Sequence, residues 1–223
     1  MAGMGRVRAP LLGLIVVWAV SACGSGSPAG ASQSAGPGAS SAPASASAPI
    51  ASTSGTLHST AIKACSVLDE ATMSTLTGFP VKDFGPGDPV ARVPFTDNSF
   101  ANKNGDALHQ SSCGYWETGV TGELSRDIVT TIFQGDPAKP GSATTAALHG
   151  QFAIMQDLAA SLGAQPVAGI GDEAFSVTSA GGSRLVVRAG DLVVTAESIA
   201  PPNTTQLTLA DLTRVVQAIL AHV

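Results

Sequence analysis

A long uncharged stretch limits where this chain can fold. Between Gly24 and Ile62 there is no Asp, Glu, Lys or Arg, and serine, alanine, glycine and four prolines dominate the segment. It has no periodic apolar face, so no burial offsets the entropy lost on ordering it. We therefore expect a disordered Ser/Ala/Gly/Pro linker over residues 23–60, with a reach of roughly 35 Å. The folded domain is expected over residues 61–223.

The residues before the linker have the layout of an export signal. Arg6 and Arg8 precede a short apolar run, Leu11–Val20, and small residues follow it. This order of basic, apolar and small residues is typical of a secretory signal peptide. The run is shorter than the ~20 residues that a membrane-spanning helix needs. We therefore expect residues 1–22 to be a signal peptide.

The end of this segment, Val20-Ser21-Ala22-Cys23, resembles the lipobox of bacterial lipoproteins. The resemblance implies cleavage after Ala22 and attachment of a diacylglycerol to the Cys23 thiol. Two or more acyl chains anchor a protein stably, whereas one chain does not. We therefore expect a membrane anchor at Cys23 and a location on the outer face of the cytoplasmic membrane, in the cell envelope. The alternative is a secretory signal peptide that is cut elsewhere and leaves Cys23 without lipid.

Charge narrows the range of partners. The full chain has a formal net charge of −5. Two of its basic residues, Arg6 and Arg8, belong to the expected signal peptide, so the exported part is more acidic still. It also has no cluster of Lys and Arg. Long-range electrostatics therefore do not favour nucleic acid or anionic lipid headgroups as partners.

Two cysteines remain once Cys23 is assigned to lipid. An even pair in an exported domain, here Cys65 and Cys113, favours a disulfide. A bridge between these two positions would stabilise the fold by roughly 4 kcal/mol through the entropy of the unfolded chain. Two buried free thiols are the alternative. A metal site is disfavoured further, because neither cysteine has a CxxC or HxxxH partner nearby.

Three segments of the domain have the pattern of helices. The first begins near Ser66 with a capping-box-like start and ends at Gly78. The second, Ala143–Leu162, carries one apolar stripe at helical spacing. The third, Leu209–Ala221, has Thr208 as its N-cap. The stripe of the second helix consists of Leu148, Phe152, Met155, Ala159 and Leu162.

About five strands are expected among these helices, because short β-branched and aromatic runs alternate in polarity. The last two are joined by a two-residue Gly-Asp turn that suits a hairpin. Helices on one face of a largely antiparallel sheet would make an α+β domain. The expected strands are Gly114–Glu117, Arg126–Gln134, Phe175–Val177, Leu185–Ala189 and Leu192–Ala196.

One long segment does not fit this pattern. Pro80–Ser112 is polar, contains Gly and Pro throughout, and has a single short strand candidate at Val90–Phe95. It is long for a connection within a compact domain, and such loops tend to be functional or mobile. The sequence assigns no role to it.

Two glycine-containing motifs invite a functional interpretation. Gly169–Ala174 fits the dinucleotide fingerprint G-x-G-x-x-A, but that fingerprint needs a helix to open at its second glycine, and a strand pattern follows here. Asn102–Gly105 resembles a calcium loop, yet the alignment places Phe100 and Ser111 where carboxylates are required. We interpret the first as a tight turn before a strand and the second as a polar turn. We therefore expect no cofactor and no metal.

The sequence offers no catalytic set. No serine lies in a G-x-S-x-G motif, and the histidines lack the spacing of metal ligands. Asp172 and Glu173 are the only carboxylate pair beside glycines, and neighbours in a turn usually point apart. We therefore expect no enzymatic activity, with an envelope hydrolase as the alternative. The four histidines are His58, His109, His149 and His222.

Tyr115 and Trp116 stand out because aromatic residues make up only 4% of the chain. Trp116 is also the only tryptophan after the expected cleavage site. One interpretation is a core position packed on a Cys65–Cys113 bridge. The other is the wall of a pocket for an apolar or ringed ligand.

Several of these features together resemble the actinobacterial lipoproteins called domain of unknown function 3558. The resemblance covers about Ala61–Val223 and implies a secreted, usually lipid-anchored α+β domain with a Cys65–Cys113 disulfide and no established enzymatic activity. The layout is also similar to the extracytoplasmic sensor domains of mycobacterial receptor kinases, so a sensing role is a further alternative. The matching features are Cys65-Ser66-Val67-Leu68 at the start of a helix, Cys113-x-x-Trp116 on a strand, Gly169–Ala174 before a hairpin, and an amphipathic terminal helix.

These observations favour a non-catalytic lipoprotein whose domain binds a small apolar or lipid ligand or another envelope protein. A sizeable apolar cavity between sheet and helices, bordered by Trp116, would favour the small ligand. A flat, exposed apolar patch would favour a protein partner.

Overall fold

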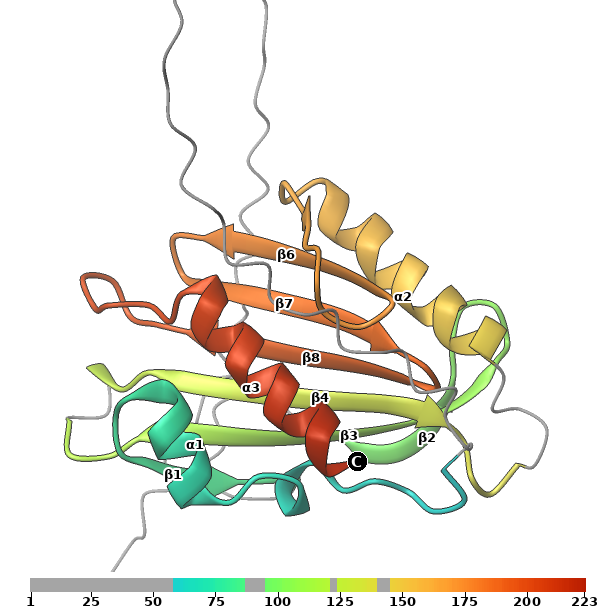
Figure 1. The fold of residues 1–223 in the computed structure, drawn as a ribbon, viewed down its shortest axis with the longest axis horizontal. Helices are drawn as coiled ribbons and strands as arrows, with labels where there is room; N and C mark the ends of the chain where they lie inside the picture. Colours follow the sequence, from blue (N-terminus) through green and yellow to red (C-terminus); the bar gives the residue numbers. More distant parts are fainter. Residues whose placement is uncertain (1–57, 87–94, 121–123, 140–144) are drawn as a thin grey trace, which may run out of the picture. The chain divides into compact units, whose positions relative to one another are not determined.

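The computed structural model describes the folded domain and leaves most of the N-terminal part outside. The described residues are 58–86, 95–120, 124–139 and 145–223. The expected signal peptide, Cys23 and most of the linker lie outside them, as does nearly all of the strand expected at Val90–Phe95. Within the described residues, three α-helices and an antiparallel sheet of eight strands confirm the α+β class (Figure 1).

All strands of the described residues belong to one sheet. Its order is β1-β3-β4-β8-β7-β6-β5. Both β1 and β2 pair with the same edge of β3: β2 pairs with residues 107–111 and β1 with residues 114–117. The sheet is larger than the expected five strands because β1, β2 and β5 add three short edge strands. The strands are β1 (Val81–Phe84), β2 (Asp97–Ala101), β3 (Ala107–Glu117), β4 (Asp127–Gly135), β5 (Gln165–Pro166), β6 (Glu173–Ser179), β7 (Gly182–Ala189) and β8 (Leu192–Ile199).

The segment Pro80–Ser112 departs most from expectation, because it supplies β1, β2 and the first half of β3. Most side chains of β2 are exposed, so its sequence shows no alternation between apolar and polar residues. Polar side chains are common on edge strands, where they discourage pairing with other molecules. The pairing of β1 and β2 with β3 therefore depends on tertiary contacts that a local pattern does not reveal.

Helix α1 (Glu70–Thr77) begins later than expected. Its N-cap is Asp69, whose carboxylate accepts a hydrogen bond from a backbone N–H of the first turn at 2.7 Å. Ser66 instead ends a short 3-10 turn, η1 (Ala64–Ser66). Gly78 ends the helix with a φ of 79°, a left-handed conformation that glycine adopts without strain.

The other two helices follow the sequence pattern. Helix α3 (Leu209–His222) starts with a complete capping box formed by Thr208 and Asp211. Helix α2 (Thr145–Ala160) ends before Leu162, which therefore lies outside the helix whose apolar stripe it was expected to extend.

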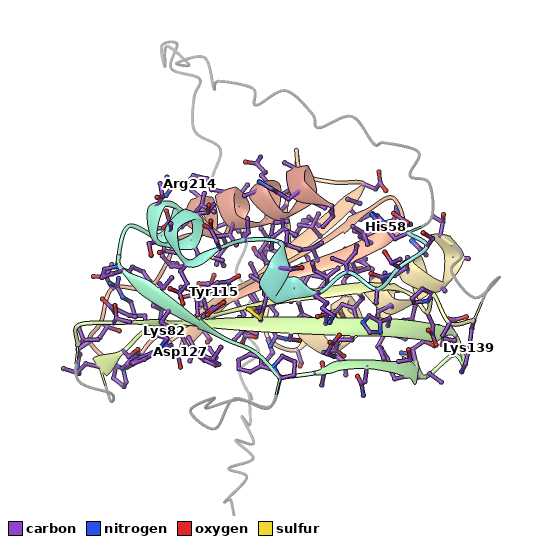
Figure 2. All side chains as sticks on the ribbon, turned by 90° about the horizontal axis from the view of Figure 1, so that it is seen from below. His58, Lys82, Tyr115, Asp127, Lys139 and Arg214 are labelled. Atoms are coloured by element: carbon purple, nitrogen blue, oxygen red, sulfur yellow. A yellow bond between two sulfur atoms is a disulfide. The ribbon has the colours of Figure 1, made fainter. Side chains whose placement is uncertain are left out.

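The helices occupy both faces of the sheet. Neighbouring residues of a strand point to opposite faces. Leu185 and Val187 of β7 share a core cluster with Leu212 of α3, whereas Val186 shares another with Phe152 of α2. We call these the α3 face and the α2 face. Helix α1 contributes to the α3 face, where it lies beside α3 (Figure 2), so α2 differs from the expected arrangement with all helices on one face.

The N-terminal end of the described chain lies across the α3 face. The backbone N–H and the Nδ1 atom of His58 lie 3.1 and 2.9 Å from one carboxylate oxygen of Asp191 in the β7–β8 turn. The side chain of Gln134 then bonds the carbonyl of Thr60 at 2.9 Å and the N–H of Ile62 at 2.7 Å. Residues 58–60, placed in the linker by the sequence prediction, thus already contact the domain.

Candidate functional site

A groove opens on the α2 face at the C-terminal end of α2. It has a volume of about 650 Å³, and pockets that hold small ligands measure roughly 300–1,000 Å³. We call it the α2 groove. One wall consists of Met155, Leu158 and Ala159 of α2 and of Leu162 in the turn after the helix. The floor on β6–β8 includes Phe175, Val177, Arg184, Val186, Glu197 and Ile199.

The groove exists because α2 stops short of the strand ends. The chain turns after the helix, where the N–H groups of Leu162 and Ala164 both bond the carbonyl of Ala159. Gly163, with a φ of 77°, supplies the left-handed residue of this turn. The C-terminal ends of β6 and β8 and the N-terminal end of β7 then form a floor that α2 does not cover.

Two leucines at the groove are the most exposed large apolar side chains among the described residues. Leu158 is 72% exposed and Leu162 is 66% exposed. Exposed apolar area costs free energy, and its concentration beside a concave surface is typical of a binding site. Sequence reasoning missed the groove. The available signal was Leu158, which is apolar, falls outside the predicted stripe and stands four residues before Leu162.

The floor of the groove contains one ion pair. Arg184 of β7 lies opposite Glu197 of β8, and its Nε and Nη2 atoms donate to the Oε2 atom of Glu197 at 3.0 and 2.6 Å. In the register of the sheet, Val177 is opposite Arg184 and Val129 is opposite Glu197. Val186 and Ile199 follow on the same face. The pair is therefore flanked by aliphatic residues on its own face of the sheet, and Ser179 and Ser183 add two uncharged polar residues to the lining.

Tyr115 and Trp116, the candidates for a pocket wall, point to opposite faces of β3. Tyr115 is fully buried on the α3 face, between the sheet and the helices, and donates its hydroxyl to the carbonyl of Leu68 at 2.9 Å (Figure 2). Burial raises the pKa of its phenol above the ordinary value. The residue belongs to the same core cluster as Cys113. Tyr115 is thus a core residue and does not line the groove.

Trp116 is half-buried on the α2 face and is not among the residues that line the groove. In the sheet register it lies opposite Asp127, which in turn lies opposite Ile199. Adjacent strands are about 4.8 Å apart, so two strand spacings, roughly 10 Å, separate Trp116 from the groove floor.

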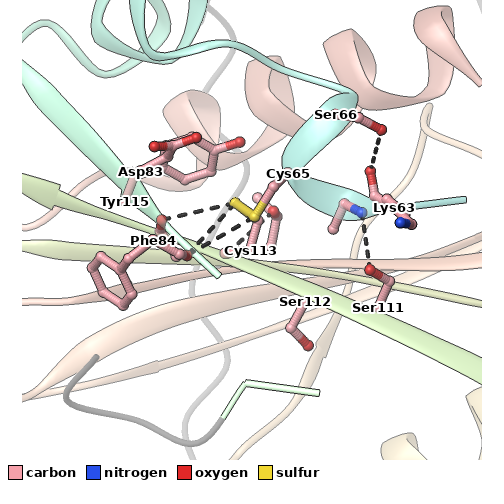
Figure 3. Close-up of a disulfide and its surroundings, with 12 residues drawn as sticks. Lys63, Cys65, Ser66, Asp83, Phe84, Ser111, Ser112, Cys113 and Tyr115 are labelled. Carbon is pink, nitrogen blue, oxygen red and sulfur yellow. Dashed lines mark hydrogen bonds between the residues drawn. A yellow bond between two sulfur atoms is a disulfide. The ribbon is translucent and has the colours of Figure 1, made fainter. Parts of the chain in front are cut away.

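Cys65 and Cys113 form the predicted disulfide, with their Cα atoms 4.9 Å apart (Figure 3). The bridge joins η1 to β3 on the α3 face. Next to it, the N–H of Ala64 donates to the hydroxyl of Ser111 at 3.0 Å. The disulfide therefore fixes the N-terminal segment to β3, and neither cysteine is a free thiol or a metal ligand.

The motif Gly169–Ala174 forms a turn into β6, in agreement with its interpretation from sequence. A Cβ atom at Gly171 would lie 2.4 Å from the carbonyl oxygen of Arg188, so only glycine fits there. The carboxylates of Asp172 and Glu173 do not point apart, because the guanidinium of Arg188 binds them at 2.9 and 3.0 Å. These charge-assisted bonds tie the turn to β7.

The remaining polar motifs are also accounted for by local bonding. Asn102 accepts bonds from the N–H groups of Asn104 and Asp106 at 2.9 and 3.0 Å, which closes the predicted polar turn. In the described parts of the chain, no group of three or more His, Cys, Asp or Glu is placed to hold a metal ion. There, no histidine bonds a serine or cysteine side chain. The histidine contacts are His58–Asp191, His109–Asp97, His149–Glu173 and His222–Ala218.

No protein-family model matches this chain, and the comparison with curated proteins found no match. No helix within the described ranges combines the length and the apolar character needed to cross a membrane. A function for the domain therefore has to be inferred from its residues and geometry.

Proposed function

We propose that this protein is a non-catalytic, lipid-anchored lipoprotein on the outer face of the cytoplasmic membrane, and that its domain binds a small apolar or lipid molecule in the α2 groove. One observation carries the binding proposal. Leu158 and Leu162, the two most exposed leucines of the described chain, edge an apolar groove of about 650 Å³.

The proposed anchor rests on the sequence of the N-terminus. A basic and then apolar segment precedes Cys23, whose neighbours resemble a lipobox. The Cys65–Cys113 disulfide supports this location, because structural disulfides persist in oxidising compartments outside the cytoplasm. The resemblance to the actinobacterial lipoprotein family points to the same setting.

The shape of the apolar surface favours a small ligand over a protein partner. Protein interfaces usually bury about 800 Å² on each partner and present a broad surface. The exposed leucines instead edge a concave site between α2 and the sheet. Its size lies within the range of sites that enclose most of a small ligand.

The expected linker joins the domain at a point distant from the groove. The N-terminal segment reaches the domain at His58, which bonds the β7–β8 turn. The groove lies at the opposite end of β7, about seven residues away along the strand, or roughly 25 Å at the rise of a β-strand. It also opens on the α2 face, whereas residues 58–66 lie across the α3 face.

Both parts of the proposal are tested with the full chain carrying Cys23→Ser. Released from its anchor, this variant is expected in the culture medium of its own host, whereas the unchanged chain stays with the membrane fraction. Native mass spectrometry of the released protein is expected to show a bound molecule of low mass. The double variant Leu158→Glu/Leu162→Glu should lose that molecule, because it places charge at the edge of the groove.

The control is Leu209→Glu, which changes an exposed leucine on α3 that does not line the groove. It should keep the bound molecule. Membrane retention of the Cys23→Ser chain would overturn the anchor. A bound molecule that survives the double variant would overturn the assignment of the groove, and a chain without any bound molecule that also fails to take up added acyl lipid would overturn the binding function.

A further inference from the structure

We propose that the α2 groove selects acyl ligands with a neutral, hydrogen-bonding head group over acyl anions, and that Glu197 sets this selectivity by pairing with Arg184. The inference rests on the proposed function of the same groove and specifies the class of ligand. It follows from the walls of the groove, its charge balance and the atoms that its ion pair leaves open.

The walls of the groove suit a flexible hydrocarbon chain. Leu158 and Leu162 face a floor in which Val177, Val186 and Ile199 are aliphatic, and Phe175 is the only aromatic side chain of the lining. Ringed ligands are usually recognised by stacking or edge contacts with several aromatic residues. An aliphatic lining offers dispersion contacts without a preferred ring orientation, which favours an acyl chain.

The groove carries no net charge. Of the residues that line it, only Arg184 and Glu197 are charged, and they bond each other. The side chain of Arg184 is 48% exposed and that of Glu197 is 30% exposed, so a bound ligand would contact the pair. A ligand that enters the groove therefore meets a neutral pair and no free cation.

The pair leaves N–H donors of Arg184 and one carboxylate oxygen of Glu197 open. Both guanidinium bonds go to the Oε2 atom of Glu197. Among the described residues, the Nη1 atom of Arg184 and the Oε1 atom of Glu197 have no hydrogen-bond partner. A hydroxyl or amide group can accept from the first and donate to the second without disturbing the pair. A monoacylglycerol and a fatty amide are ligands of this class.

An acyl anion meets the opposite situation. Its carboxylate could accept a bond from the open Nη1 atom of Arg184, but it would then lie beside the carboxylate of Glu197, which repels it. A bidentate bond to Arg184 requires Glu197 to be displaced. The displaced carboxylate would then lie on an aliphatic floor without a partner, and it would repel the new anion. Glu197 therefore acts as a specificity-determining residue that excludes anions from an otherwise cationic site.

The test compares two lipids of equal chain length, a monoacylglycerol and a fatty acid, as competitors of a fluorescent acyl probe bound to the Cys23→Ser chain. We expect the unchanged groove to bind the monoacylglycerol roughly tenfold or more tightly than the fatty acid. Glu197→Gln should raise the affinity for the fatty acid by roughly tenfold, because it frees the charge of Arg184. The double variant Arg184→Gln/Glu197→Gln should lose that gain.

A second single variant tests whether an unpaired Glu197 repels acyl anions. Arg184→Gln leaves Glu197 unpaired, so binding of the fatty acid should weaken further. The unfolding midpoints of all variants should stay near that of the parent, since a partly exposed ion pair contributes little to stability. Equal affinity for the two lipids, or a Glu197→Gln variant without gain for the anion, would overturn the selectivity but leave the groove as a lipid site. If neither lipid displaces the probe and the probe itself does not bind, the proposed function falls as well.

Discussion

The two faces of the sheet are covered to different extents. On the α3 face, α1, α3 and the N-terminal segment pack over the strands, and residues such as Leu212 and Tyr115 are fully buried. On the α2 face, a single helix among the described residues covers part of the sheet and leaves a groove beside it. The most exposed leucines of the described chain lie on this second face.

This difference suggests a division of roles. Burial of apolar area is the main favourable contribution to folding, and the α3 face combines it with a disulfide and a buried tyrosine hydrogen bond. The α2 face leaves apolar area uncovered, which has no benefit for stability. We therefore expect substitutions on the α3 face to change the free energy of unfolding and substitutions at the groove to change binding.

The largest expected effect is loss of the disulfide. Cys65→Ala/Cys113→Ala should lower the free energy of unfolding by about 4 kcal/mol, because the bridge closes a loop with a sequence separation of 48. Denaturant unfolding of the parent and the variant under non-reducing conditions measures the difference. A loss below about 1 kcal/mol would show that the bridge contributes little to the stability of the α3 face.

The next effect compares one leucine from each face. Leu212→Ala removes a fully buried side chain of α3 and should cost roughly 2–5 kcal/mol. Leu158→Ala removes a side chain that is 72% exposed and should change stability by less than about 0.5 kcal/mol. Both values come from the same unfolding experiment. Similar costs for the two variants would contradict the division between the faces.

Tyr115 gives a smaller effect with a distinct dependence on pH. Tyr115→Phe removes the bond to the carbonyl of Leu68 and should cost roughly 1–2 kcal/mol at neutral pH. The pKa of the folded phenol is raised by burial, so the folded state keeps its proton at a pH where the unfolded chain has lost it. The contribution of Tyr115 is therefore complete below its ordinary pKa of 10.0 and is lost as pH rises above that value.

The measurement is direct because Tyr115 is the only tyrosine of the chain. Absorbance of tyrosinate should appear only together with unfolding, at a pH above 10.0. The Phe variant should show a flatter decline of stability in this range. Tyrosinate formation in the folded protein near the ordinary pKa would place the ring in contact with water and contradict its position in the core.

The smallest effect concerns the ion pair of Glu117 and Arg126 at one end of the α3 face, where the Nη2 and Oε1 atoms lie 2.7 Å apart. The bonds from Arg126 lower the pKa of Glu117 below its ordinary value of 4.5. This contribution is present above pH 4.5 and is lost as pH falls through the lowered pKa. Glu117→Gln should cost about 1 kcal/mol at neutral pH, with the difference disappearing in acid. A cost that stays constant in acid would exclude the charge as its cause.

Turn and capping residues in the sequence predicted several ends of helices and strands. The Gly190-Asp191 turn, the capping box at Thr208 and the left-handed Gly78 each specify an element boundary within a few residues. The disulfide was predictable because the expected lipidation of Cys23 leaves only Cys65 and Cys113 as partners. The start of α1 was missed because Ser66 and Asp69 are both good N-caps, and the packing of η1 decides between them.

Tertiary features were not predictable in the same way. The stripe of α2 shows which residues face a sheet but does not show which of its faces they cover, so the position of α2 required the structure. The edge strands β1 and β2 have polar sequences and depend on pairing with β3. The groove depends on where α2 ends relative to the consecutive strands β6, β7 and β8, and no local sequence pattern shows this position. Tyr115 and Trp116 were singled out for their rarity, which does not indicate the face to which each points.

The most direct test of the central claim is photo-crosslinking of an acyl lipid, with a photoactivatable group in its chain, to the full chain carrying Cys23→Ser. Peptide mapping then locates the adducts. We predict saturable labelling within residues 155–162, 175–186 and 197–199, which form the α2 groove, and competition by unlabelled monoacylglycerol. Labelling concentrated on α1 or α3, or labelling without saturation, would contradict the assignment of binding to the open face of the sheet.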